Sequence, residues 1–201
     1  ILDVNVGLPE IDERAMLCKV VSAVQSVTDL PLQLDSADPS ALEGAMRIYC
    51  GKPLINSVNG EKEKMDALFP LVKKYGGALI ALAMDETGIP NTAAESVAII
   101  EKIISEAGKY GIEKKDIIAD PLCLTVSSDQ KSALVTLEAV RMLRERGIKT
   151  SLGVSNISFG LPEREKINAC FYGCALENGL DCAIMNPRSK AMTDVYYAVK
   201  A

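Results

Sequence analysis

Histidine is absent from the 201 residues of this chain. Its absence excludes the Ser-His and Cys-His nucleophile systems, the most frequent general base and the commonest metal ligand. Any chemistry that the protein performs must therefore proceed without an imidazole side chain.

Clusters of lysine and arginine are also missing, and the formal net charge is −5. Because cationic side chains that neutralise phosphates supply most of the affinity for nucleic acids, we expect no nucleic-acid partner. No apolar run approaches the roughly 18 residues of a transmembrane helix, so no membrane partner is expected either. A hydrophobic content of 48% with 24% charged residues is typical of a globular domain.

The six cysteines include no CxxC pair, although Cys170 and Cys174 lie four residues apart on an expected helix. We interpret all six as reduced core cysteines of a cytoplasmic protein rather than as metal or cluster ligands. No bound metal is predicted.

What the sequence does contain is a repeated pattern, in which an apolar run ends on Asp or Asn and a stretch long enough for a helix follows. The clearest run is IIADPLCL, residues 117–124, where Pro121 cannot continue a strand and leaves Asp120 at its carboxyl end. The other runs are LDVNVG, LQLDS, LINSVN, LIALAMD, SLGVSN and CAIMN. This alternation predicts parallel strands joined by right-handed crossovers.

Seven strands and seven helices are expected, the helices at about residues 10–28, 41–49, 61–75, 92–110, 129–146, 162–178 and 189–200. A closed barrel of this kind has eight such units. We therefore predict an α/β fold, a (β/α)8 TIM barrel whose first β/α unit is absent from this chain. Residues 1–201 are expected to form one domain, incomplete at the amino end.

The carboxyl ends of the strands share one face of a parallel barrel, so their polar side chains are expected to converge on one mouth. Carboxylates and amides suit a flat heterocycle, because a carboxylate accepts two N–H bonds from an amino-pyrimidinone. Two alternatives stay open. Asp and Asn are ordinary turn and cap residues, and a divalent cation could be held by Asp3, Asp35, Asp85 and Asp120.

Five segments carry a family resemblance, and they are LDVNVGLPEID, LPLQLDSAD, LINSVNGE, IIADPL and LGVSNISFGLPER. In this order and spacing they resemble the pterin-binding barrel of methyltetrahydrofolate:corrinoid methyltransferases, a family that includes the folate module of cobalamin-dependent methionine synthase. The resemblance implies transfer of the N5-methyl group of 5-methyltetrahydrofolate to Co(I) of a corrinoid. The corrinoid (cobalamin) is expected on a partner protein or domain, and a homodimer is possible.

The resemblance also implies roles for six residues around the pterin, namely Asp3, Asn5, Asp35, Asn56, Asp120 and Asn156. Asp120 matches the carboxylate that grips the amino-pyrimidinone edge. Asn156 matches a mobile asparagine that reaches the N5 region, and it is the expected catalytic residue.

Other readings compete with this one. Dihydropteroate synthase is similar, but it uses a late lysine and an Arg-x-His on its last strand, where this chain reads CAIMNP. A folate-presenting module of methionine synthase without independent turnover is a second alternative, and a barrel that has lost its ligand is a third. The Gly-Glu-Arg-x-Asn segment of the family's first strand is absent, and Phe159-Gly160 favours the methionine synthase branch.

Overall fold

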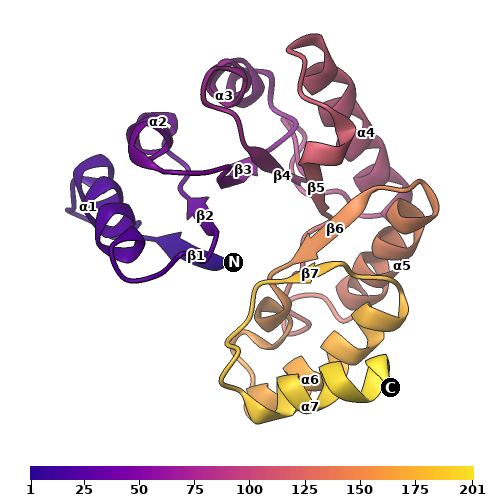
Figure 1. Cartoon of the computed structure of the whole chain (residues 1–201). Coiled ribbons are helices and arrows are strands. Elements are labelled where there is room, and N and C mark those ends of the chain that lie inside the picture. Colours follow the sequence, from indigo (N-terminus) through magenta and orange to yellow (C-terminus); the bar gives the residue numbers. More distant parts are fainter. The chain divides into compact units, whose positions relative to one another are not determined.

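The computed structural model describes residues 1–201 as seven strands that alternate with seven α-helices (Figure 1), as predicted. The strands are β1 (Leu2–Asn5), β2 (Leu32–Asp35), β3 (Leu54–Val58), β4 (Ala78–Leu82), β5 (Ile117–Asp120), β6 (Lys149–Leu152) and β7 (Cys182–Ala183). The helices are α1 (Glu13–Gln25), α2 (Pro39–Ile48), α3 (Lys62–Tyr75), α4 (Ala93–Lys109), α5 (Ser132–Glu145), α6 (Arg164–Glu177) and α7 (Lys190–Lys200). Two 3-10 helices are η1 (Lys114–Asp116) and η2 (Val154–Ser158).

The chain forms two compact units. Unit 1 comprises Ile1–Ala81 and Lys102–Ile118, and unit 2 comprises Leu82–Glu101 and Ala119–Ala201. No helix combines the length and the apolar character that crossing a membrane requires.

In unit 1, strands β1 to β4 lie side by side in sequence order, and each neighbouring pair is parallel. Val4, Leu34 and Ile55 are in register across β1, β2 and β3, and all three are buried. Helices α1, α2 and α3 pack along one side of these strands (Figure 1). Because the apolar core of a β/α layer lies between its strands and its helices, we infer that these three buried side chains are on the helix side. Because side chains alternate along a strand, the residues between them project from the opposite face.

The first helices begin where a carboxylate caps them. The Asp12 carboxylate accepts the Ala15 N–H at 3.0 Å, so α1 begins at Glu13 rather than near Glu10 as predicted. Asp38 caps α2 in the same way through the Ser40 N–H at 2.8 Å, and Pro39 suits the first helical position. This helix therefore starts two residues earlier than predicted.

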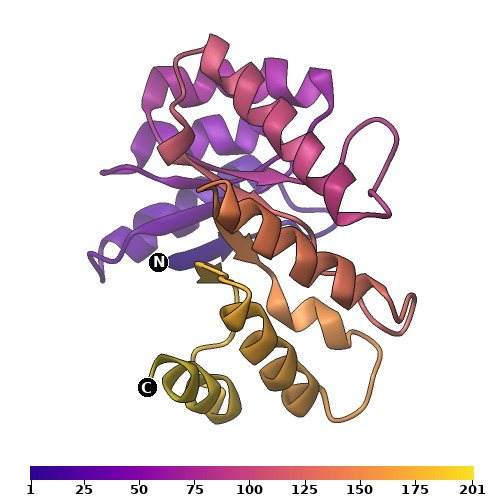
Figure 2. The same ribbon diagram turned by 90° about the vertical axis from the view of Figure 1, so that its right-hand side faces the viewer.

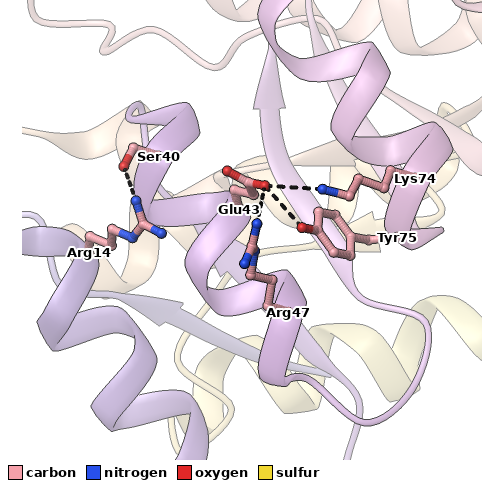
Figure 3. A network of polar contacts seen from close by, with 6 residues as sticks. All are labelled: Arg14, Ser40, Glu43, Arg47, Lys74 and Tyr75. Atoms are coloured by element: carbon pink, nitrogen blue, oxygen red, sulfur yellow. Dashed lines mark hydrogen bonds and ion pairs between the residues drawn. The ribbon is translucent and has the colours of Figure 1, made fainter.

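Polar contacts connect successive helices on the outside of unit 1 (Figure 3). Arg14 of α1 donates to Ser40 of α2 at 3.0 Å. The Glu43 carboxylate of α2 accepts from Arg47 at 3.2 Å and from the Tyr75 hydroxyl at 3.0 Å, and Lys74 lies 3.5 Å away. The bonds from Tyr75 and Arg47 lower the pKa of Glu43. Because exposed ion pairs contribute little stability, these contacts mainly set how the helices align.

Unit 2 contains the parallel pair β6 and β7, with Ser151 opposite Cys182. Its core includes Val140 of α5, Leu152 of β6, and Phe171 and Tyr172 of α6. Helices α6 and α7 pack against each other, and both views show them side by side (Figures 1 and 2).

Strand β5 ends at Asp120, as predicted, but three other strands are shorter than predicted. They end at Leu82, Leu152 and Ala183, where the apolar patterns suggested Asp85, Asn156 and Asn186. The Asp85 carboxylate instead accepts the Thr87 N–H at 2.9 Å and its hydroxyl at 2.7 Å, and Asn186 accepts the Arg188 N–H at 3.0 Å. These two side chains form turns, which is the ordinary role of Asp and Asn after a strand.

All six cysteines are free thiols. Cys123 is buried, but Cys50, Cys170 and Cys174 are exposed, so their assignment to the core was wrong. Two of the exposed cysteines lie on α6, where the weak amphipathic pattern of the helix gave no clear inner face.

Candidate functional site

Three of the predicted site residues form a row in unit 1. Asn5 at the end of β1 is in register with Asp35 of β2, and Asp35 is in register with Asn56 of β3. By the alternation described above, all three project from the face turned away from the helices. The row therefore presents one carboxylate between two amides.

The two amides differ in their partners. The Asn5 side chain is hydrogen-bonded to Asp35, and its Oδ1 accepts the Gly7 N–H at 3.0 Å. The Asn56 side chain has no hydrogen-bonding partner within the protein. Asn5 thus holds Asp35 in place, whereas the Asn56 amide is available to a ligand.

Asp3 lies two residues before Asn5 and on the same face. Its Oδ1 accepts a hydrogen bond from Gln33 Nε2 at 2.7 Å, and Gln33 itself is buried. Sequence reasoning missed Gln33, although a polar residue at an alternate position of the apolar run LQLD was a usable signal.

The electrostatics of unit 1 favour a ligand that donates hydrogen bonds. Burial raises the pKa of Asp3. Burial also raises the pKa of Asp35, with smaller contributions from the charges of Asp3 and Glu13, while the bond from Asn5 opposes the rise. Glu13, in the first turn of α1, accepts from the Ser36 hydroxyl at 2.5 Å and was not predicted. N–H donors would stabilise the ionised form of these carboxyls.

Asp120 ends β5 and is the most deeply buried of the predicted residues, with 8% of its surface exposed. Burial raises its pKa to about 7, and the only opposing contribution is the hydrogen bond that its Oδ1 accepts from the Leu122 N–H at 2.8 Å. No cation compensates the charge. The turn is tight, since Leu122 adopts a left-handed φ of 64° directly after Pro121.

Asn156 lies in the 3-10 helix η2 and not at the end of strand β6 as predicted. Its side chain is exposed and lies over Gly153, where a Cβ atom would be 3.0 Å from Asn156 Nδ2. Arg164 supports this turn, donating to the Ser158 hydroxyl at 3.0 Å and to the Ser155 carbonyl at 2.9 Å. Sequence reasoning also missed Arg164, because its partners are backbone and hydroxyl groups.

The predicted residues thus fall into two groups. Asp3, Asn5, Asp35 and Asn56 come together in unit 1, and Asp120 and Asn156 belong to unit 2. No group of three His, Cys, Asp or Glu side chains is arranged to hold a metal ion, so nothing in the geometry favours the divalent-cation alternative.

A cavity of about 820 Å³ in unit 1 lies elsewhere. Loops that precede β3, β4 and β5 line it, among them Gly51, Gly77 and Tyr110. It is therefore at the amino ends of the strands, and none of the predicted site residues lines it.

Comparison with known proteins identifies the family. Residues 1–186 match the family described as pterin binding enzyme. The chain belongs to this family.

Two relatives narrow the assignment of this pterin-binding enzyme within the family. It is 36% identical over its full length to methylcorrinoid:tetrahydrofolate methyltransferase of Eubacterium limosum, of which it covers 75%. It is 33% identical over 92% of its length to methionine synthase of Mycobacterium tuberculosis, of which it spans only 17%. The predicted membership of the methyltetrahydrofolate:corrinoid methyltransferase family is confirmed, and the chain is a member of a methyltransferase group.

Solved structures confirm the fold. Dihydropteroate synthase from Thermus thermophilus superposes with a TM-score of 0.81 over 99% of this chain and 81% of that one. The α/β fold of the pterin-binding TIM-barrel type is thus as predicted. The sequence identity is 20%, so this likeness concerns the fold alone.

Proposed function

We propose that this pterin-binding enzyme binds 5-methyltetrahydrofolate and transfers its N5-methyl group to Co(I) of a corrinoid carried by a partner protein or domain. The observation that carries the proposal is the row of Asn5, Asp35 and Asn56 at the carboxyl ends of adjacent strands. A carboxylate flanked by amides matches the alternating donors and acceptors of a pterin. The similarity to the Eubacterium limosum methyltransferase supports the reaction class.

Folate binding is assigned to Asp120 of unit 2 and to Asp3 and Asp35 of unit 1. Asp120 is buried without a cation, so its ionised form gains most from a ligand that donates two N–H bonds. The 2-amino group and the neighbouring ring N–H of the pterin are such donors. Asp3, Asn5, Asp35 and Asn56 of unit 1 are proposed as further pterin-binding residues.

Catalysis is assigned to Asn156. A tertiary amine is a poor leaving group, so N5 must gain a proton or a strong hydrogen bond as its bond to the methyl carbon breaks. The exposed Asn156 amide is free to donate such a bond, and the proton would arrive through water. A donor that acts mainly in the transition state raises the rate rather than the affinity.

The direction of transfer depends on the partner. The name of the Eubacterium limosum relative describes transfer from a methylcorrinoid to tetrahydrofolate, the reverse of the direction proposed here. Both directions pass through one transition state, so the groups that stabilise it accelerate both. Supplying either methylated reactant would therefore report on the same site.

A second candidate follows from the match to methionine synthase, of which this chain corresponds to 17%. In that case the chain presents the folate to a corrinoid domain and has no turnover with a free corrinoid. The folate-binding part of the proposal is shared by both candidates.

The deciding experiment has two steps. Titration calorimetry with 5-methyltetrahydrofolate should show saturable binding, and free cob(I)alamin should then be methylated, which its absorbance reports. Asp35→Ala and Asp120→Ala should lose binding, while Asp194→Ala, an exposed carboxylate on α7, should retain it. Absence of binding would refute both candidates. Binding without transfer would select the presenting module.

A further inference from the structure

The turn that carries Asn156 is attached to the loop that follows Asp120. Thr125 donates from its hydroxyl to the Phe159 carbonyl at 2.8 Å, and Ser127 donates to the same oxygen at 3.1 Å. The backbone adds a third bond, from the Val126 N–H to the Ile157 carbonyl at 3.0 Å. Both segments belong to unit 2, so these contacts lie within one compact unit.

The two hydroxyls form a small network of their own. Their oxygens are 2.9 Å apart, and the Ser127 N–H donates to Thr125 Oγ1 at 3.3 Å. Each hydroxyl has one proton, so two of the three hydroxyl contacts are hydrogen bonds at any moment. In every arrangement of the protons at least one hydroxyl holds the Phe159 carbonyl.

Arg164 holds the other side of the turn through the Ser155 carbonyl and the Ser158 hydroxyl. The Phe159 N–H closes the turn on the Asn156 carbonyl at 3.0 Å. The backbone on both sides of Asn156 is therefore fixed, whereas its side chain is exposed and makes no hydrogen bond within the protein. This arrangement fixes the backbone that carries the Asn156 side chain, and the side-chain amide remains available to form a hydrogen bond with a ligand.

We propose that Thr125 and Ser127 are positioning residues for methyl transfer, because their hydroxyls fix the turn from which Asn156 reaches N5. This inference rests on the proposed function. The same loop begins at Asp120, so only four residues separate the carboxylate proposed to bind the pterin from the Thr125 hydroxyl that holds the turn. A displacement of about 1 Å at a reacting group costs up to about 100-fold in rate.

The test compares variants in single-turnover methyl transfer to free cob(I)alamin. Thr125→Val combined with Ser127→Ala should lower the transfer rate about tenfold, a part of the loss expected for misplacement. Its affinity for 5-methyltetrahydrofolate should stay within about twofold of the wild type, because the pterin contacts remain. The conservative variant Thr125→Ser keeps a hydroxyl at this position, so it should retain most of the wild-type transfer rate. Ser128→Ala is the matched control, since that hydroxyl bonds only to the Thr125 carbonyl within its own loop.

A double-mutant cycle separates positioning from a general structural role. In an Asn156→Ala background the hydroxyl substitutions should slow transfer by less than about twofold, because the group that they position is gone. The same tenfold loss in both backgrounds, or no loss in the wild-type background, would overturn the inference. If the double variant fails to fold, Thr125→Val alone enters the same cycle, because the Thr125 hydroxyl makes the shorter contact with the Phe159 carbonyl. If the wild-type protein transfers no methyl group, the proposed methyl transfer fails as well. If the wild-type protein is active and the hydroxyl substitutions do not change its transfer rate, only the positioning inference fails.

Discussion

At the residue scale, Asp120 is a proposed site residue whose ionised form lowers the stability of the fold, because the carboxylate is buried. Burial raises its pKa from 3.8 to about 7, so the folded protein binds this proton more tightly than the unfolded chain does. The contribution of this carboxyl to stability is therefore full below about pH 4, falls as the pH rises toward 7 and is lost above it. A position that destabilises the fold at neutral pH is the kind of position that a ligand, rather than packing, explains.

Folate affinity should depend on pH through Asp120. In the proposed complex the ionised carboxylate accepts the N–H bonds of the pterin, so the dissociation constant should rise about tenfold per pH unit below pH 7 and level off above it. Calorimetry from pH 5.5 to 8.5 measures this. Asp120→Asn should bind more weakly and lose that part of the pH profile. A wild-type profile that coincides with that of Asp120→Asn would contradict the assignment.

The same substitution should stabilise the protein at high pH. Asp120→Asn removes the buried charge and keeps an oxygen that accepts the Leu122 N–H. A shift of about three pKa units corresponds to an upper bound of about 4 kcal/mol. Denaturant unfolding should thus show a gain of a few kcal/mol at pH 8 and almost none at pH 4. An equal effect at both pH values would point to packing instead of charge.

Asn156→Ala should separate catalysis from binding. Loss of one donor that acts in the transition state typically costs about 100-fold in rate. The single-turnover rate should fall by about this factor, while the affinity for 5-methyltetrahydrofolate changes by less than about threefold. Unchanged transfer would remove Asn156 from the mechanism.

At the element scale, the start of α4 is a local feature that the sequence specified well. Thr92 and Glu95 have the three-residue spacing of a capping box in the sequence, and the structure contains this box. The Glu95 N–H donates to the Thr92 hydroxyl at 3.2 Å, and the Thr92 N–H donates to the Glu95 carboxylate at 3.0 Å. Both partners lie within four residues of each other, so a short window of sequence was sufficient.

Removing this cap should destabilise α4 without touching the site. Thr92→Ala should lower the free energy of unfolding by about 1 kcal/mol, the usual cost of losing a hydroxyl cap. Ser105→Ala, an exposed change within the same helix, is the control and should be nearly neutral. Chemical denaturation measures both. Equal effects of the two substitutions would show that the Thr92 cap contributes nothing of its own.

At the scale of the whole molecule, both units are proposed to contribute to one function. Asp35 belongs to unit 1 and Asp120 to unit 2. A ligand that binds only the folded state stabilises it by about 2.7 kcal/mol at a concentration of 100 times its dissociation constant. The thermal midpoint of the wild type should therefore rise with 5-methyltetrahydrofolate.

Substitution in either unit should remove this ligand effect. Asp35→Ala and Asp120→Ala should each melt at the same temperature with and without the folate, while Asp194→Ala should show the wild-type shift. Differential scanning fluorimetry compares the four proteins directly. If Asp35→Ala kept the full shift, unit 1 would have no part in binding. A homodimer stays a prediction, which sedimentation of the purified protein would test.

The sequence by itself determined the number and order of the elements, the α/β class and the position of Asp120 at a strand end. It did so because each of these follows from a local pattern, such as an apolar run, a proline or a cap. It also carried the family resemblance, since the polar segments keep their order along the chain. Only the tertiary structure decided which residues became neighbours. Gln33 reaches Asp3 across 30 residues, and Ser36 reaches Glu13 across 23.

Tertiary structure likewise decided what each strand-end residue does. Asp85 and Asn186 form local turns, Asn156 moved from an expected strand into a 3-10 helix, and the register of β1, β2 and β3 aligned one carboxylate with two amides. Residues of the same type after similar apolar runs thus differ in role. The physical reason is that strand register and long-range hydrogen bonds depend on how separate segments pack, and no short window of sequence contains both partners.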